Sequence, residues 1–292
     1  VAVGLVGSEM CIRDRMGRIA ANHALSDLYA CGARPIAALA AIILPFARSD
    51  LLRRDLAQVL EGALREFATA DCQLVGGHSM QGPEMQVGFA VSGQAMQPER
   101  GLLSKRGACV GDVLILSKSL GTGVLFAAHM QQQADGRDVA LSLEMMLQSN
   151  IRAAAVALAG GARGGPDITG VGLLGHLLEM LGPGQGAALQ LANLPALPGV
   201  LQHLGAARRS SGHAANAASA AGALQADSAT GLAQVELLFD PQTSGGLLVA
   251  VSPEMQEQFC GELHQAGYAA AAIIGEIIAV DHAPSGPRIL LV

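Results

Sequence analysis

Asp27 is an acidic residue within an apolar helical pattern. It shares helical spacing with Ala20, Ala24 and Cys31. A carboxylate on an apolar helix face costs free energy unless it is paired or bound to a metal ion. Asp27 is therefore a candidate metal ligand. The alternative is a carboxylate at the edge of the helix that reaches solvent.

Asp167 lies in a glycine-rich stretch, just before Thr169 and Gly170. Mg²⁺ takes oxygen ligands and usually keeps several waters, so a carboxylate in such a loop can bind it. The local sequence favours the alternative, a side chain that caps the following helix. The G-x-G-x-x-G spacing over residues 170–175 is a weak dinucleotide signal, because a loop rather than a strand precedes it.

The segment Gly76-Gly77-His78-Ser79 is the third candidate, and it ends a predicted strand. Successive backbone N–H groups and a hydroxyl can hold phosphate oxygens. The alternative is an ordinary turn from strand to loop. The polar segment 240–246 lies between two predicted strands, and it is either a structural corner or part of a site lining; its pattern favours the corner.

Hydrophobic periodicity predicts a mixed α/β (α+β) chain that divides near residue 108. The helices are expected over 17–31, from Ser49 onward, from Gly121 onward, and over 142–160, 172–181 and 253–267. The strands are expected over 36–44, in the residues before 76, and over 85–96, 112–118, 235–239, 246–251, 270–280 and 288–292.

Composition narrows the classes of partner. The chain has 292 residues, 51% of them hydrophobic, only 3% aromatic, and a net charge of −6 with no basic run. A nucleic-acid-binding surface is therefore not expected. The longest apolar run, 36–47, is too short to span a membrane and contains Pro45. The five cysteines have no C-x-x-C spacing, which indicates reduced thiols and a cytoplasmic protein.

Five segments, taken in order and spacing, resemble the motifs of the selenophosphate synthetase (selenide, water dikinase) family, within the aminoimidazole ribonucleotide synthetase-like superfamily. They are GRIAANHALSDLYACGARP (17–35), VGGHSMQGPE (75–84), GDVLILSKSLGTG (111–123), PDITGVGLLGHLLEM (166–180) and FDPQTSGGLL (239–248). The resemblance implies a two-domain fold, with an ATP-binding and dimerisation domain over 16–107 and an α/β domain over 108–292. It also implies a homodimer in which the N-terminal sheets pair and share the ATP site.

The implied reaction converts ATP, selenide and water into selenophosphate, AMP and phosphate, with Mg²⁺ and often K⁺, for selenocysteine or selenouridine synthesis. By the same resemblance, Asp27 contacts ATP through Mg²⁺, and Asp167 binds metal. Gly77, His78 and Ser79 contact ATP.

Residues 1–15 match nothing in this resemblance and are expected to be an artefactual leader. The family's catalytic cysteine or selenocysteine and its lysine belong to a segment upstream of the motifs found here, so no residue of this chain is assigned a catalytic role. The N-terminal domain is accordingly expected to be truncated and the chain inactive. The alternatives are a catalytically dead paralogue that acts as a dimerisation or regulatory partner, and a related kinase with another phosphoryl acceptor.

Overall fold

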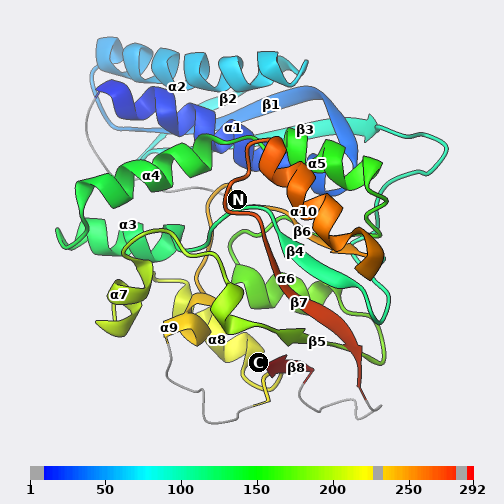
Figure 1. Ribbon diagram of the computed structural model, residues 1–292. Coiled ribbons are helices and arrows are strands. Elements are labelled where there is room, and N and C mark those ends of the chain that lie inside the picture. The colour runs from blue at the N-terminus through cyan, green and yellow to red at the C-terminus, as the bar shows by residue number, and fades with distance from the viewer. Residues whose placement is uncertain (1–9, 226–232, 281–287) are drawn as a thin grey trace. The chain divides into compact units, whose positions relative to one another are not determined.

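The computed structural model describes residues 10–225, 233–280 and 288–292. The chain forms two compact units (Figure 1). Unit 1 runs to Leu102 and also takes in Met146–Ile151, and unit 2 comprises Leu103–Met145 and the chain from Arg152 onward. The structure confirms the predicted mixed α/β class.

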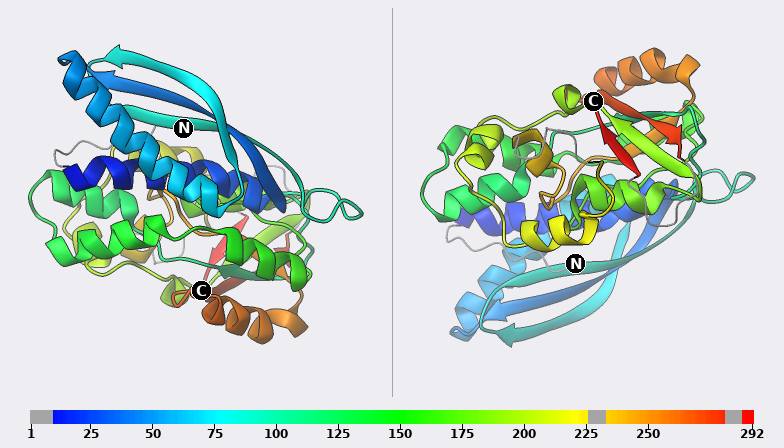
Figure 2. Two further views of the ribbon diagram at one scale, coloured as in Figure 1. Left: turned by 90° about the horizontal axis from the view of Figure 1, so that it is seen from above. Right: turned by 90° about the horizontal axis from the view of Figure 1, so that it is seen from below.

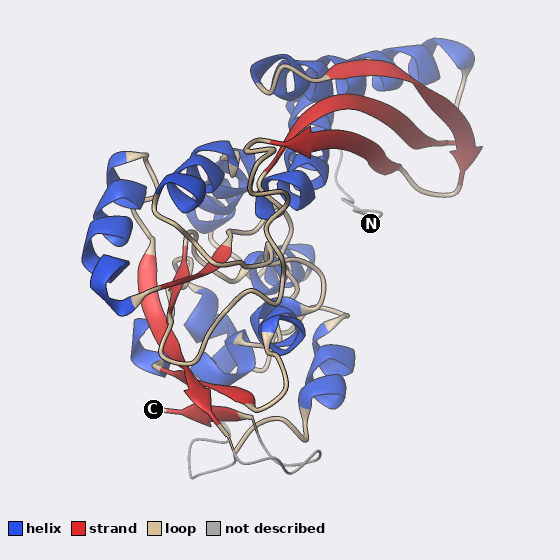
Figure 3. Cartoon of the chain, turned by 90° about the vertical axis from the view of Figure 1, so that its right-hand side faces the viewer, coloured by secondary structure: helices blue, strands red, loops and turns tan. Residues whose placement is uncertain are grey.

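Unit 1 is a small sheet with two long helices on one face, as Figure 3 shows. Its elements are α1 (Met10–Ala30), β1 (Ala33–Pro45), α2 (Ser49–Thr69), β2 (Gln73–Gly82) and β3 (Gln86–Ala95). The strand order is β2-β1-β3, with β2 parallel and β3 antiparallel to β1. The parallel pair needs the crossover that α2 provides. β2 pairs with β1 alone, so it is an edge strand of this sheet.

The two helices of unit 1 cross at glycines. A Cβ on Gly17 would lie 2.0 Å from the Val59 carbonyl oxygen, and one on Gly62 would lie 2.0 Å from the Asp14 carbonyl oxygen. Only glycine allows the backbones to approach this closely. Of the expected leader, residues 1–9 lie outside the described residues, and 10–15 form the first turns of α1, which therefore begins earlier than the predicted residue 17.

Unit 2 is built on a larger sheet of strand order β6-β4-β7-β5-β8. Neighbouring strands are antiparallel except β5 and β8, which lie side by side in Figure 2. The strands are β4 (Val113–Leu116), β5 (Gln185–Leu189), β6 (Leu248–Val251), β7 (Ala272–Ala279) and β8 (Ile289–Leu291). The helices are α3 (Thr122–Met130), α4 (Gly136–Leu147), α5 (Ile151–Ala159), α6 (Gly172–Met180), α7 (Val200–Gly205), α8 (His213–Ala220), α9 (Ala233–Leu237) and α10 (Gln256–Gln265), with short 3-10 turns at Leu191–Asn193 and Pro253–Met255.

Two predicted elements were wrong. The helix expected over 142–160 is broken between α4 and α5, where the Asn150 amide donates to Ser26 Oγ at 2.8 Å. The Asn22 amide likewise donates to the Leu147 carbonyl at 2.9 Å, so this stretch belongs to unit 1. The strand expected over 235–239 is the short helix α9 with the turn that follows it, because periodicity cannot separate a short buried helix from a buried strand.

In the part of the chain that the structure describes, no helix has the length and apolar character needed to cross a membrane.

Candidate functional site

The segment Gly76–Ser79 lies inside β2, whereas the sequence analysis expected it at the end of a strand or in a turn after one. Gly77 has φ +152°, and a Cβ there would lie 2.3 Å from the Ala40 carbonyl oxygen on β1. This position therefore requires glycine, because any side chain would push the two strands apart.

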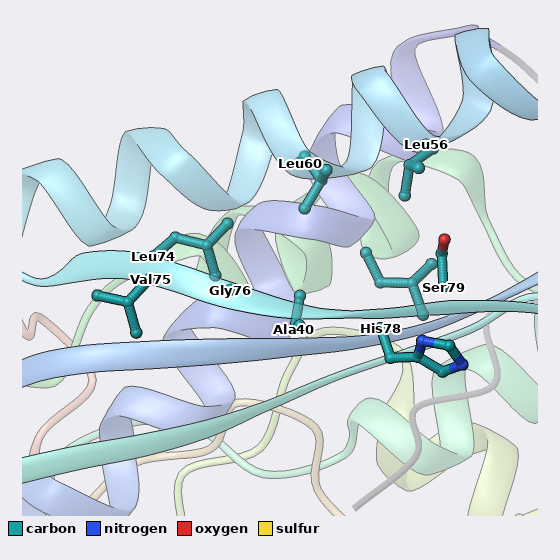
Figure 4. A pocket seen from close by; sticks show the side chains of 10 residues that line it. Ala40, Leu56, Leu60, Leu74, Val75, Gly76, His78 and Ser79 are labelled. Carbon is teal, nitrogen blue, oxygen red and sulfur yellow. The ribbon is translucent and has the colours of Figure 1, made fainter.

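The side chains of His78 and Ser79 lie on opposite faces of the sheet. Ser79 is in register with Ile42, which is buried under the helices, whereas His78 is in register with exposed Ala41. In Figure 4 the Ser79 side chain points toward Leu56 of α2 and the His78 ring points the other way. A ligand on the helix side of β2 can thus reach the Ser79 hydroxyl but not the His78 ring.

A pocket of about 360 Å³ lies between β2 and α2. Leu56 and Leu60 of α2 form one wall, and Gly76–Ser79 form part of the other. A second cavity of about 290 Å³ shares Leu56 and Ser79 with it. The pocket is largely apolar and has one hydroxyl at its edge, which is the usual character of a small-molecule site.

Asp27 is exposed, which corrects the expectation that it lies on the apolar face of its helix. The buried position is its neighbour Ser26, at 1% exposure, whose hydroxyl accepts from Asn150. Water can solvate the Asp27 carboxylate, so the cost that first singled it out is not present. Its assignment as a metal ligand then depends on the resemblance alone.

Asp167 is buried, at 5% exposure, and pairs with Leu247 in an antiparallel bridge. It does not cap α6, whose N-cap position is Val171 and carries no side-chain cap. The capping role that the local sequence favoured is therefore wrong.

Lys118 is the residue that the sequence analysis missed. It is 1% exposed, and its Nζ donates to the Ser244 carbonyl at 3.1 Å. Burial lowers the pKa of Lys118 from 10.5 to about 7, and the nearby charge of Asp167 opposes that shift. The burial of this lysine depends on the segment 244–247, which lies far away in sequence, so no local signal marked it.

Two glycines allow the segment 244–247 to lie between Lys118 and the loop that carries Asp167. A Cβ on Gly246 would lie 2.6 Å from the Lys118 amide nitrogen, and one on Gly245 would lie 2.1 Å from the Ile168 carbonyl oxygen. The Ile168 amide donates to the Gly246 carbonyl at 2.8 Å. The structure thus brings together three of the sequence motifs in unit 2.

The polar residues of the segment 240–246 hold the N-terminus of α3. Gln242 Oε1 accepts from the amides of Gly121 at 2.9 Å and Thr122 at 3.2 Å. Asp240 Oδ2 accepts from the Val124 amide at 3.2 Å. Burial raises the pKa of Asp240 from 3.8 to about 7, although these hydrogen bonds lower it. These contacts fit the structural corner that the pattern favoured.

The donor set suits a metal ion that arrives with a ligand. Within the described ranges, no three His, Cys, Asp or Glu side chains form a group that could hold a metal ion. Mg²⁺ is commonly held by one or two carboxylates together with substrate phosphates, rather than in a protein cage. Asp167 is a single buried carboxylate, so it fits that arrangement. Asp27 belongs to unit 1 and Asp167 to unit 2.

Both parts of the chain match domains of a known protein family. Residues 5–95 match the N-terminal domain of AIR synthase related protein, and residues 110–284 match its C-terminal domain. The selenide, water dikinase of Dechloromonas aromatica is 37% identical over 263 residues, which are 89% of this chain and 74% of that protein. The chain belongs to the selenide, water dikinase family. The predicted family is thereby confirmed, and the family is one of phosphotransferases.

Other members of the selenide, water dikinase family show similar levels of identity. The proteins of Burkholderia orbicola and Salmonella typhi are 39% and 38% identical over 264 residues, or 90% of this chain and 73% and 74% of theirs. Among solved structures, a hydrogenase maturation protein HypE in complex with ATP has a TM-score of 0.69 at 18% identity, covering 94% of this chain and 75% of that one. Thiamine monophosphate kinase from Aquifex aeolicus has a TM-score of 0.67 at 17% identity, covering 100% and 85%. These two neighbours confirm the predicted fold.

Proposed function

We propose that this member of the selenide, water dikinase family makes selenophosphate from selenide, ATP and water, and releases AMP and phosphate. The selenophosphate serves selenocysteine or selenouridine synthesis. The observation that carries the proposal is the 37–39% identity to selenide, water dikinases over about nine-tenths of the chain. The protein works in the cytoplasm and takes ATP and selenide as its small-molecule substrates.

ATP binds in unit 1, at β2. Support for this placement comes from the apolar pocket beside Ser79, which Gly76 and Gly77 also line. Ser79 donates to a phosphate or ribose oxygen from the helix side. His78 projects from the opposite face of the sheet. It therefore contacts a different ATP molecule from the one that Ser79 contacts.

Asp27 in unit 1 and Asp167 in unit 2 are each a ligand of Mg²⁺, and K⁺ is a second cation of the reaction. When bound, a metal ion held by these carboxylates would neutralise charge on the phosphoryl groups during transfer. Exposed Asp27 meets the hydrated metal without a desolvation cost, and buried Asp167 offers a carboxylate already held by its loop.

The protein is a homodimer through the open face of the sheet in unit 1. Large apolar side chains are exposed on that sheet: Ile36 at 43%, Leu39 at 50% and Met80 at 43%. Ala38 and Ile42 on β1 are buried under the helices. Leu39 follows Ala38, and Met80 is in register with Ile43, which follows Ile42. Because successive side chains of a strand alternate between faces, Leu39 and Met80 project away from the helices. Several large apolar side chains exposed on one face of a sheet are typical of a protein interface. The pairing brings His78 of each protomer to the shared face.

The test is ³¹P NMR of the protein incubated anaerobically with ATP, Mg²⁺ and selenide. Selenophosphate, AMP and orthophosphate in equal amounts support the proposal. Formation of ADP as the end product would instead indicate a related kinase with another acceptor. ATP binding without any turnover would favour the inactive chain or the dead paralogue, and pull-down of an active synthetase would then identify the paralogue.

A further inference from the structure

Thr169 is fixed next to Asp167 by both its backbone and its side chain. Its carbonyl accepts from the amides of Gly172 and Gln242, both at 3.0 Å. Its hydroxyl oxygen lies 3.0 Å from His176 Nε2 on α6. The two backbone contacts hold the position of Thr169, and the contact with His176 fixes the direction of its hydroxyl.

The Thr169 side chain shares a face with Asp167. Residues 166–168 run antiparallel to 246–248, so this part of the loop is extended. Side chains two apart in an extended segment project to the same side. Ile168, between them, is fully buried in the core of unit 2, so the alternation of side chains places Asp167 and Thr169 on the other side of the segment from Ile168.

A carboxylate also lies close to the His176 ring. Its Nδ1 lies 3.4 Å from Glu179 Oε2, one turn along α6. Lys105 Nζ contacts the same oxygen at 2.8 Å, and this contact is the main reason that the pKa of Glu179 lies below its usual range. A carboxylate next to Nδ1 favours a proton on that nitrogen, which leaves Nε2 as an acceptor.

The tautomer decides what the Thr169 hydroxyl can do. A hydroxyl has one proton to donate and two lone pairs that accept. When Nε2 of His176 accepts that proton, only lone pairs are left for a ligand. Lone pairs suit a cation or its bound water and do not suit a phosphate oxygen.

From this geometry we infer that Thr169 Oγ1 is a further oxygen ligand, direct or through one water, of the cation held by Asp167, and that His176 is its positioning residue. The inference rests on the proposed metal role of Asp167. It adds a neutral oxygen to a carboxylate, a combination that Mg²⁺ and Mn²⁺ accept.

The test is Mn²⁺ binding to the full chain with a non-hydrolysable ATP analogue, read from the EPR signal of free Mn²⁺. Thr169→Val should raise the Mn²⁺ Kd about tenfold, and His176→Leu should do the same, since supporting groups at metal sites contribute about 10- to 100-fold. Thr169→Ser keeps the hydroxyl and should stay within about twofold. Thr69→Val, at an exposed threonine of α2, is the matched control.

The variants separate this inference from the proposed function. If Asp167→Asn leaves the Mn²⁺ Kd unchanged, the metal role of Asp167 fails and the inference fails with it. If Asp167→Asn weakens binding and Thr169→Val does not, the inference alone is overturned. Equal losses for Thr169→Val and Thr169→Ser would also overturn it, because the hydroxyl would not be the cause.

The ¹⁵N shifts of labelled His176 give a second readout that a loss of folding cannot imitate. We expect the proton on Nδ1 and an unprotonated Nε2. The opposite tautomer would overturn the argument, since the Thr169 hydroxyl would then be able to donate to a ligand.

Discussion

Replacing Asp240 with asparagine tests whether ionisation of this buried carboxyl group lowers the stability of the fold. The pKa of Asp240 is raised from 3.8 to about 7, chiefly by burial. A group whose pKa is raised on folding stabilises the fold below its unfolded pKa, and this stabilisation is lost as the pH rises through the folded value. A rise of about three pH units corresponds to about 4 kcal/mol, since each unit is about 1.36 kcal/mol.

The asparagine of the Asp240→Asn variant cannot ionise, yet it keeps an oxygen for the Val124 amide, which Asp240 Oδ2 now accepts at 3.2 Å. The variant should therefore gain stability relative to the unaltered chain as the pH rises. From about pH 5 to about pH 7.5 we expect a relative gain of about 2–3 kcal/mol. Above that range the difference should stay constant.

The assay is urea unfolding followed by far-UV circular dichroism across this pH range, with hydrogen exchange of α3 to show where the change occurs. Asp135→Asn is the control, because Asp135 is an exposed aspartate of the same unit. A stability difference between Asp240→Asn and the unaltered chain that does not change with pH would refute the reasoning.

Three further predictions concern glycines and the open sheet. Gly246→Ala places a Cβ 2.6 Å from the Lys118 amide nitrogen and should cost about 1–3 kcal/mol by calorimetry, with unchanged stability counting against the close approach. Gly62→Ala should destabilise the α1–α2 crossing by a similar amount in urea unfolding, whereas Gly261→Ala, with nothing within 4 Å of the new Cβ, should stabilise by about 1 kcal/mol. Leu39→Asp should convert a dimer to a monomer in sedimentation without loss of helical signal, and a dimer that persists would exclude this face as the interface.

Most of unit 1 could be predicted from hydrophobic patterning. The apolar run of β1 and the amphipathic pattern of α2 both fall where they were expected. Gly76 and Gly77 were expected at the end of a strand or in a turn after it, because consecutive glycines usually punctuate a strand. In the fold they continue the strand, since Gly77 must lie against the backbone of β1.

The candidate site was harder to predict, because adjacent residues of a helix lie on different faces. Ser26 and Asp27 are consecutive, yet one is buried and the other exposed, and an apolar pattern of small residues does not resolve that rotation. Lys118 was not predicted either. Whether a lysine at a strand end is exposed depends on which distant segment covers it, and here that segment is 244–247.

Unit 1 is completed by a stretch of chain made after α3 and most of α4 of unit 2. During synthesis, Asn22 and Ser26 of α1 therefore exist before the Leu147 carbonyl and Asn150 that they bond. A gene fragment that stops at Leu102 would leave these polar groups of α1 without those hydrogen bonds. Unit 1 therefore cannot be separated from unit 2 by cutting the chain at one position. For the same reason, a single protease cut between the units would not release unit 1 whole. Mixing unit 1 of one relative with unit 2 of another would require transferring residues 146–151 as well.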